Sequence, residues 1–325
     1  MHQKAGTILQ LFREQRGFVS GGEISRTLCV SRTAVWKHIS GLREAGYVIE
    51  AIPSRGYRLV SAPDILNREE IAAQLKTVVI GRQLICRDET GSTNADAFRL
   101  AEEGAPEGTV VLADTQMSGK GRRGRSWSSP PGVNLYCSVV LTPGVKPHEA
   151  PQLTFLSAVA VARAVEITTG LRPEIKWPND VLIAGRKVAG LLNEMSAETD
   201  GINFVILGIG VNLNMAMAQF PSDLRQPGTS LFLETGQRVN RVRFAVTMLN
   251  ELDRLYADFT RHGFGPVRDE WQVRCNANGR ELVVSDAGQE VVRGMFSGID
   301  GDGALLVRLP DGRVERILSG DVRVI

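Results

Sequence analysis

The stretch 21–60, GGEISRTLCVSRTAVWKHISGLREAGYVIEAIPSRGYRLV, decides the fold of the N-terminal part of the chain. Residues 22–28 and 32–44 have the apolar spacing of two helices, separated by a tight turn at Cys29 and Val30. Ser31 is a suitable N-cap for the second helix, which stops at Gly46. The period then changes to that of two short strands, 47–51 and 57–60, around the turn 53–56.

A third helix, residues 6–16, precedes this stretch, so three helices and a hairpin predict a winged helix-turn-helix. Residues 1–60 hold nine Lys and Arg against four Asp and Glu, a net charge of +5, whereas the other 265 residues carry −3. A basic head on a mildly acidic body indicates a polyanionic partner for the head alone.

DNA suits such a head because a helix fills the major groove and a wing reaches the backbone. A winged helix used only for protein contacts is the alternative. Trp36 could be an exposed contact residue, but we expect it to be partly in the core. The residues predicted to contact DNA are Ser31, Arg32, Thr33, Lys37 and Arg55.

The composition excludes several classes of protein. With 325 residues and 43% hydrophobic residues, the chain has enough apolar material for two or three folded domains, which excludes disorder as its main state. Its four cysteines form no CxxC pair, which argues against zinc ribbons and redox centres and favours a reducing compartment. The apolar stretches 153–162 and 204–211 are too short to span a membrane, so we expect no membrane association and a cytoplasmic protein.

The body alternates strand-like and helical runs and predicts an α+β or mixed α/β domain with a largely antiparallel sheet. After Pro63 and Asp64, we expect residues 65–75 to form a helix that links head and body. The C-terminal part of the chain, from about Cys275, has the pattern of short strands around the turns 286–288, 300–303 and 311–312, which predicts a small SH3-like barrel. The predicted strands are 84–87, 109–115, 135–142, 175–178, 181–183, 187–195, 203–211, 282–284, 291–296, 304–309 and 314–318, and the predicted helices of the body are 93–103 and 151–169.

The loop SGKGRRGR at 118–125 is the most informative stretch of the body. Its glycines let main-chain N–H groups approach an anion, and its four cationic side chains neutralise the anion's charge. The spacing is neither that of a Walker P-loop nor that of a dinucleotide-binding GxGxxG turn. A solvated loop or a second nucleic-acid patch is the alternative. Trp127, which follows directly, could close over a flat ligand.

Four more motifs have a plain structural explanation when each is taken alone. GSTN at 91–94 could be a helix N-cap. KWPND at 176–180 combines a cation, an aromatic, a proline and two oxygen-bearing side chains, which suits an ATP or metal edge, but alone it could be a turn between strands. Lys187 lies in the strand-like run GRKVAG at 185–190, and GIGVN at 208–212 could be packed core or backbone against which a ligand lies flat.

Taken together and in this order, the five motifs resemble those of the biotin–protein ligase (biotin–[acetyl-CoA-carboxylase] ligase) family. The resemblance covers essentially the whole chain, and the winged helix makes it similar to the bifunctional form that also represses the biotin operon. The implied domains are a winged helix-turn-helix at 1–63, a mixed α/β ligase domain of the biotin/lipoate type at 64–274 and an SH3-like domain at 275–325.

The resemblance also implies roles for individual residues. The biotin ureido ring has two donors and one acceptor, all of which a buried pocket must pair. Lys120 stands where the family usually has Arg, which matters only if that side chain binds in a bidentate manner. The implied catalytic residues are Arg122 and Lys187. The implied biotin-binding residues are Ser92, Thr93, Asn94, Gln116, Lys120, Gly121, Arg122, Lys187, Gly208 and Gly210. The implied ATP or adenylate contacts are Arg122, Arg123, Trp127, Asn179, Lys187 and Asn212, with Asn179 also a candidate Mg²⁺ ligand.

The implied reaction uses ATP and Mg²⁺ to form biotinyl-5′-AMP and then transfers biotin to a lysine of the biotin carboxyl carrier protein of acetyl-CoA carboxylase. The adenylate-bound form is then expected to dimerise and bind operator DNA. Three alternatives stay open from the sequence: a lipoate–protein ligase, a ligand-sensing transcription factor without catalysis, and a ligase whose winged helix has no regulatory role.

Overall fold

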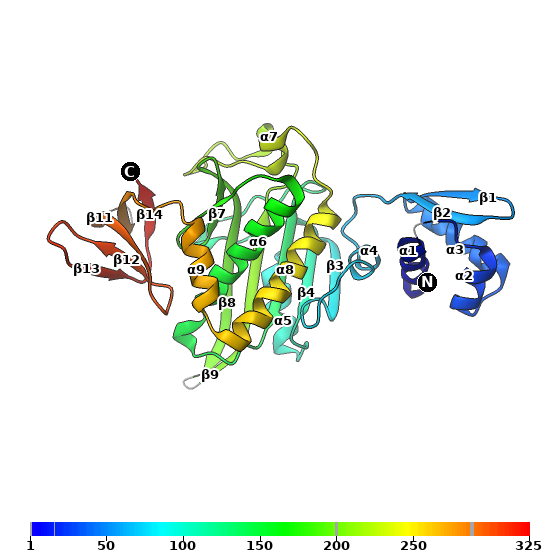
Figure 1. The fold of residues 1–325 in the computed structure, drawn as a ribbon, viewed down its shortest axis with the longest axis horizontal. Helices are drawn as coiled ribbons and strands as arrows, with labels where there is room; N and C mark the ends of the chain where they lie inside the picture. Colours follow the sequence, from blue (N-terminus) through cyan, green and yellow to red (C-terminus); the bar gives the residue numbers. More distant parts are fainter. Residues whose placement is uncertain (1, 16, 199–200, 287–288) are drawn as a thin grey trace. The chain divides into compact units, whose positions relative to one another are not determined.

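The computed structural model describes residues 2–15, 17–198, 201–286 and 289–325. The chain divides into two compact units, residues 1–76 and residues 77–325 (Figure 1). None of the four cysteines, which all lie among the described residues, forms a disulfide, and two of them, Cys137 and Cys275, are buried.

The first unit is the predicted winged helix-turn-helix. It contains α1 (His2–Gln15), α2 (Gly21–Leu28), α3 (Arg32–Glu44) and the antiparallel hairpin of β1 (Val48–Ile52) and β2 (Gly56–Ser61). Ser20 and Ser31 cap α2 and α3 through their side chains, as the sequence predicts for Ser31. Apolar side chains of all three helices meet in one core, in which Ile8, Ile24 and Ile39 are completely buried.

The expectation for Trp36 is wrong. Its side chain is 57% exposed on α3, because Val35, Ile39 and Leu42 occupy the buried face of that helix and Trp36, one residue after Val35, projects about a quarter-turn away from it. Arg16, the predicted last residue of the first helix, lies outside the described residues.

The segment after the wing forms a shorter helix than the predicted 65–75. α4 (Arg68–Ala72) starts at the N-cap Asn67, whose side chain accepts a hydrogen bond from the Glu70 amide at 2.8 Å. α4 packs against α1, and the buried Glu70 carboxylate pairs with Arg13. Residues 64–76 therefore fold with the first unit, although the domain limits predicted from the sequence place them in the ligase domain. The proposed domain limits of 1–63, 64–274 and 275–325 stay predictions.

The second unit is built on a seven-stranded sheet with the order β3-β4-β5-β9-β8-β7-β6. Every neighbouring pair is antiparallel except β3 and β4, so the prediction of a largely antiparallel sheet is confirmed. The strands are β3 (Gln83–Thr90), β4 (Thr109–Gln116), β5 (Leu135–Leu141), β6 (Glu174–Lys176), β7 (Asp180–Ile183), β8 (Arg186–Glu198) and β9 (Gly201–Val211).

Helices cover this sheet. α5 (Thr93–Glu102) packs on β4, β5 and β9, while α6 (Gln152–Thr169) and α8 (Arg241–His262) lie side by side across the sheet in Figure 1. Three helices, α7 (Leu231–Thr235), α8 and α9 (Gly265–Arg274), are absent from the elements predicted from the sequence. Short 3-10 turns lie at Arg122–Gly124, Pro147–Glu149 and Met217–Gln219.

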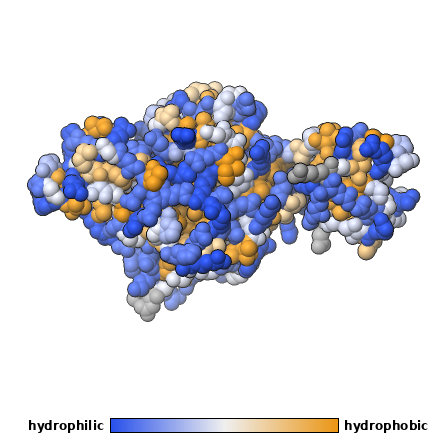
Figure 2. Space-filling view, in the orientation of Figure 1, coloured by the Kyte–Doolittle hydropathy of each residue, from blue (hydrophilic) through white to orange (hydrophobic). Residues whose placement is uncertain are grey.

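One segment of the described chain, Pro147–Thr169, is long and apolar enough to cross a membrane, but 72% of its apolar window is buried inside the fold. The face of this unit drawn in Figure 2 is mainly hydrophilic, with scattered apolar residues. The segment therefore has the burial of a core helix.

The tail forms a five-stranded antiparallel sheet with the order β13-β12-β11-β10-β14, the strand content predicted for a small SH3-like domain. Its strands are β10 (Glu281–Asp286), β11 (Gln289–Ile299), β12 (Leu305–Arg308), β13 (Val314–Ile317) and β14 (Asp321–Val324). β14 is absent from the sequence predictions, and the predicted turn residues Ala287 and Gly288 lie outside the described residues. Trp177 is buried and donates from Nε1 to the Gly303 carbonyl at 3.1 Å, which ties this sheet to the β6–β7 turn.

Candidate active site

A cavity of about 900 Å³ lies in the second unit, between the large sheet, the loop after β4 and the C-terminal sheet. Every ligand-contact residue predicted from the sequence lines this one cavity, although the predictions come from five separate motifs and from Gln116 at the end of a strand. These residues are Ser92, Thr93, Asn94, Gln116, Lys120, Gly121, Arg122, Arg123, Trp127, Asn179, Lys187, Gly208, Gly210 and Asn212.

One end of the cavity presents neutral hydrogen-bonding groups. Ser92 occupies the N-cap position of α5 but makes no capping bond with its side chain, so the explanation of GSTN as a simple helix cap does not account for it. Thr93 donates to Gln116 Oε1 from its backbone nitrogen at 2.9 Å, and its hydroxyl oxygen lies 3.1 Å from the same atom. Gln116, the last residue of β4, thus faces the start of α5 with its carbonyl oxygen.

Asn94 is held by the protein itself. Its Nδ2 donates to the Leu192 carbonyl and to Glu194, and its Oδ1 accepts from Ser138. Gly208 makes room for this amide, since a Cβ there would lie 2.2 Å from Asn94 Oδ1. The Gly208 position is therefore explained by packing against a cavity residue, and its predicted contact with biotin stays a prediction.

The loop after β4 folds back on itself. The Gly121 amide donates to the Arg125 carbonyl and the Trp127 amide to the Gly119 carbonyl, both within 2.8 Å. Arg123 and Gly124 take the left-handed conformation that closes the turn. Arg123 pairs with Asp286 at 2.8 Å and Arg125 with Asp321 at 2.7 Å, so two loop arginines contact the C-terminal sheet.

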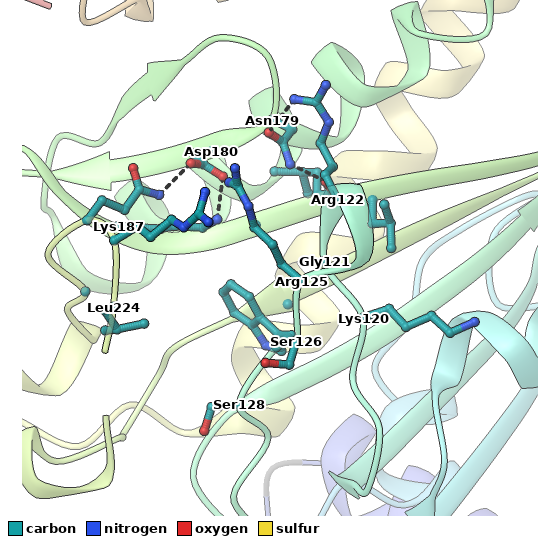
Figure 3. Close-up of a pocket in the computed structure, with 18 of the residues that line it drawn as sticks. Lys120, Gly121, Arg122, Arg125, Ser126, Ser128, Asn179, Asp180, Lys187 and Leu224 are labelled. Carbon is teal, nitrogen blue, oxygen red and sulfur yellow. Dashed lines mark hydrogen bonds and ion pairs between the residues drawn. The ribbon is translucent and has the colours of Figure 1, made fainter. Parts of the chain in front are cut away.

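Cations from three elements meet at the other end of the cavity (Figure 3). Arg122 on the loop donates to Asn179 Oδ1 at 3.3 Å, and Lys187 on β8 pairs with Asp180 on β7 at 2.6 Å. Lys120 extends away from this group in Figure 3. Lys176 donates to Gln226 Oε1 at 3.1 Å, and Gln226 in turn donates to Asp180.

The electrostatics of this end favour an anionic ligand. Burial, followed by repulsion from Arg123, lowers the pKa of Arg122, and burial lowers the pKa of Lys176 despite the attraction of Asp180. Over the whole cavity, eight Lys and Arg side chains face three Asp side chains, although Arg123 and Arg125 are already paired with Asp286 and Asp321. Phosphate groups would relieve this excess of positive charge.

Trp127 forms a flat wall beside these cations. A Cβ at Gly210 would lie 2.7 Å from its indole, and the Lys187 ammonium sits 5.3 Å from the ring centroid. Among the described residues, the buried Trp127 Nε1 has no hydrogen-bond partner. Asn212 instead uses its side chain on the Asn134 amide and the Thr229 carbonyl, which fixes the neighbouring loop.

The side chains fit a metal that arrives with its own anionic ligands. Within the described parts of the chain, no group of three His, Cys, Asp or Glu residues could hold a metal ion. Mg²⁺ is commonly held by one or two carboxylates together with substrate phosphates, and Asp180 is the carboxylate nearest the Lys187 ammonium. Asn179 donates to the Leu191 carbonyl and accepts from Arg122, so its role as a Mg²⁺ ligand stays a prediction.

Comparisons with known proteins agree on one family. Residues 85–212 match the biotin/lipoate A/B protein ligase family, residues 5–58 an HTH domain and residues 279–324 the biotin protein ligase C terminal domain. The chain is 40% identical to the bifunctional ligase/repressor BirA of Bacillus subtilis over 98% of this chain and 97% of that protein. The chain belongs to the biotin–protein ligase family.

Two further relatives support this ligase assignment. The bifunctional ligase/repressor BirA of Escherichia coli is 30% identical over 94% of this chain and 92% of its own length. The biotin protein ligase from Aquifex aeolicus, solved in complex with biotin and ATP, superposes with a TM-score of 0.65 and 29% identity over 75% of this chain and 100% of that one.

Sequence reasoning missed several residues of this ligase site. Lys176 and Asp180 belong to the KWPND motif, whose cation and oxygen-bearing side chains suit an ATP or metal edge, but only Asn179 of that motif was predicted as an individual contact. The neighbouring letters of that motif were therefore an available signal. Gln226 and the segment 320–323 reach the cavity through the tertiary fold, and no local sequence pattern marks them.

The predicted DNA-contact residues of this ligase lie on the first unit. Arg32, Thr33 and Lys37 are exposed on α3, and Arg55 on the wing stacks over Phe18 at 4.4 Å. The hydroxyl of Ser31 accepts from the Ala34 amide at 3.2 Å, so this side chain has a structural role as the helix cap. Its predicted contact with DNA stays a prediction.

Proposed function

We propose that this protein activates biotin with MgATP and transfers it to a lysine of the biotin carboxyl carrier protein of acetyl-CoA carboxylase. The observation that carries the proposal is one cavity with a neutral hydrogen-bonding end at Ser92, Thr93 and Gln116 and a cationic end at Arg122 and Lys187. The first end suits the ureido ring, and the second suits a carboxylate facing a triphosphate.

The chemistry proceeds in two balanced steps. A biotin carboxylate oxygen attacks the α-phosphorus of ATP, the bond to the β-phosphate oxygen breaks, and pyrophosphate leaves from biotinyl-5′-AMP. The neutral amine of the carrier lysine then attacks the biotinyl carbonyl, AMP leaves, and the amine gives up a proton. Neither step needs a protein nucleophile.

The chain's own residues act by position and charge. Arg122 and Lys187 offset the repulsion between carboxylate and phosphate and stabilise the charge that develops at the α-phosphate. Asp180 holds the Lys187 ammonium, and Asn179 holds the Arg122 guanidinium. The loop that carries Arg122 covers the adenylate and excludes water, which would hydrolyse it.

The first unit supports a second role as a repressor that binds operator DNA. The exposed Arg32, Thr33 and Lys37 offer positive and polar groups to a major groove. One such module binds weakly, so we propose a homodimer, formed when biotinyl-5′-AMP is bound, that acts in the cytoplasm on the genes of biotin synthesis. A ligase with a non-regulatory winged helix is the competing proposal.

The test is incorporation of biotin into a recombinant carrier domain, with pyrophosphate release followed in parallel. Biotin and MgATP should label the carrier on a single lysine, and lipoate should fail to compete. Labelling with lipoate in place of biotin would favour the lipoate ligase alternative, and binding of biotin without pyrophosphate release would favour a sensor without catalysis.

A further inference from the structure

A chain of buried hydrogen bonds leads away from the neutral end of the cavity to a carboxylate behind it. Thr93 Oγ1 lies 2.8 Å from Ser138 Oγ, and Ser138 Oγ lies 2.6 Å from Asn94 Oδ1. Asn94 Nδ2 then donates to Glu194 Oε2 at 2.7 Å. Thr93, Asn94 and Ser138 are at most 5% exposed, whereas Glu194 is half-buried on β8 and does not line the cavity.

The carboxylate fixes the direction of this chain of bonds. An ionised carboxylate only accepts hydrogen bonds, and so does the Leu192 carbonyl, the second partner of Asn94 Nδ2 at 3.2 Å. The Asn94 amide must therefore turn its nitrogen toward these two acceptors and its oxygen toward Ser138. The single Ser138 hydroxyl hydrogen is then used on Asn94 Oδ1.

This direction decides what Thr93 can offer to a ligand. Because the Ser138 hydrogen points to Asn94, only the Thr93 hydroxyl can supply the hydrogen for the 2.8 Å contact between Thr93 and Ser138. The lone pairs of Thr93 Oγ1 then remain as acceptors. Gln116 Oε1 likewise keeps acceptor capacity, since its firm bond comes from the Thr93 backbone amide at 2.9 Å.

We propose that Glu194 is a positioning residue that sets this end of the cavity to accept hydrogen bonds, and so selects a ligand ring with two N–H donors. The inference rests on the proposed function, because the ureido ring of biotin is the donor pair it explains. With a glutamine at 194 the charged acceptor is gone, and only the weaker contact with the Leu192 carbonyl at 3.2 Å still orients the Asn94 amide. When the glutamine Nε2 donates to Asn94 Oδ1, the amide reverses and gives up that contact. Ser138 would then donate to Thr93, and the Thr93 hydrogen would occupy Gln116 Oε1.

The test compares Glu194→Gln with Glu198→Gln, an exposed glutamate on the same strand, in the full-length protein. We expect Glu194→Gln to raise the KM and Kd for biotin roughly tenfold, the scale of one misdirected hydrogen bond, with the KM for ATP within about twofold of wild type. Glu198→Gln should leave both unchanged. Equal rises in the two KM values, or an unchanged Kd for biotin, would overturn the proposal.

A double-mutant cycle with Ser138→Ala separates a directed chain from a general loss of packing. Ser138→Ala alone should raise the Kd for biotin by a similar factor, since Thr93 then turns its hydrogen to Gln116. Adding Glu194→Gln to it should have little further effect, because the connection is already broken. Additive penalties would overturn the proposal, even if Glu194→Gln alone folds poorly.

The two proposals fail in different ways. A wild-type protein that releases no pyrophosphate with biotin and MgATP would contradict the proposed function itself. If the wild-type protein is active but the effects of Glu194→Gln and Ser138→Ala on the Kd for biotin are independent, only the role of Glu194 is contradicted.

Discussion

Replacing Lys187 tests the cationic end of the cavity directly. The Lys187 side chain is 22% exposed and its ammonium lies 2.6 Å from Asp180 Oδ1. Two unit charges about 4 Å apart interact by about 4 kcal/mol at an effective dielectric constant of about 20. With partial exposure, we expect Lys187→Ala to cost about 3 kcal/mol of transition-state stabilisation, a roughly hundredfold loss of rate.

The structure adds a second contribution that the sequence does not show. In Lys187→Ala, Asp180 loses its ion-pair partner and presents an unneutralised negative charge to the incoming phosphates. We therefore expect a total loss of about a thousandfold in Lys187→Ala. The double variant Asp180→Asn, Lys187→Ala should recover about tenfold of it, since each factor of ten corresponds to about 1.4 kcal/mol.

The assay is pyrophosphate release with biotin and MgATP in the absence of the carrier protein, with thermal unfolding as the check on folding. Arg186→Ala is the matched control, because Arg186 is the adjacent cation on β8 and its partner Glu234 lies outside the cavity lining. It should stay within twofold of wild type. A folded Lys187→Ala that releases pyrophosphate at the wild-type rate would refute the role of Lys187, and a double variant no faster than the single one would refute the role of Asp180.

Four further predictions concern the cavity and the first unit. The Arg122→Gly variant should release biotinyl-AMP and label bystander proteins, because the contact of the loop with Asn179 is lost. Labelling that stays confined to the carrier protein would contradict the role of this loop in retaining the adenylate. The protein should bind DNA from upstream of the biotin-synthesis genes more tightly when biotin and ATP are present, by a coupling free energy of about 1–3 kcal/mol. The Lys37→Ala variant should bind this DNA weakly, and equal affinities with and without biotin and ATP would argue against a repressor controlled by its ligand. Burial lowers the pKa of Lys176 and a bound phosphate would raise it, so MgATP binding should take up protons at alkaline pH, between the pKa of the free protein and that of the complex. Calorimetry in two buffers measures this uptake, and heats independent of the buffer would count against Lys176 as a phosphate contact. Gly56→Ala should destabilise the first unit by about 1–3 kcal/mol, because φ is +105° and the new Cβ would lie 2.1 Å from the Val19 carbonyl oxygen, whereas Gly41→Ala meets no atom within 4 Å; equal melting temperatures of the two variants would contradict this strain.

The sequence alone determined those features that depend on local spacing. The helix 32–44 is found at Arg32–Glu44 with Ser31 as its cap, because an apolar period and a capping side chain act within a few residues. The five ligand motifs are also local, since each combines glycines, cations or amides in a short stretch. They therefore predicted residues that all line one cavity.

Tertiary structure decided which partners those residues have. Asp180, Gln226 and Glu194 reach Lys187, Lys176 and Asn94 through pairing or packing between segments, which no spacing within one motif encodes. The exposure of Trp36 was likewise decided by which face of α3 meets the core, a matter of packing that outweighs the apolar character of one side chain. Gly208 and Gly210 gave the same signal as packed core glycines in the sequence. Only the fold shows that they clear space for Asn94 and Trp127, because a Cβ clash depends on atoms brought in from distant parts of the chain.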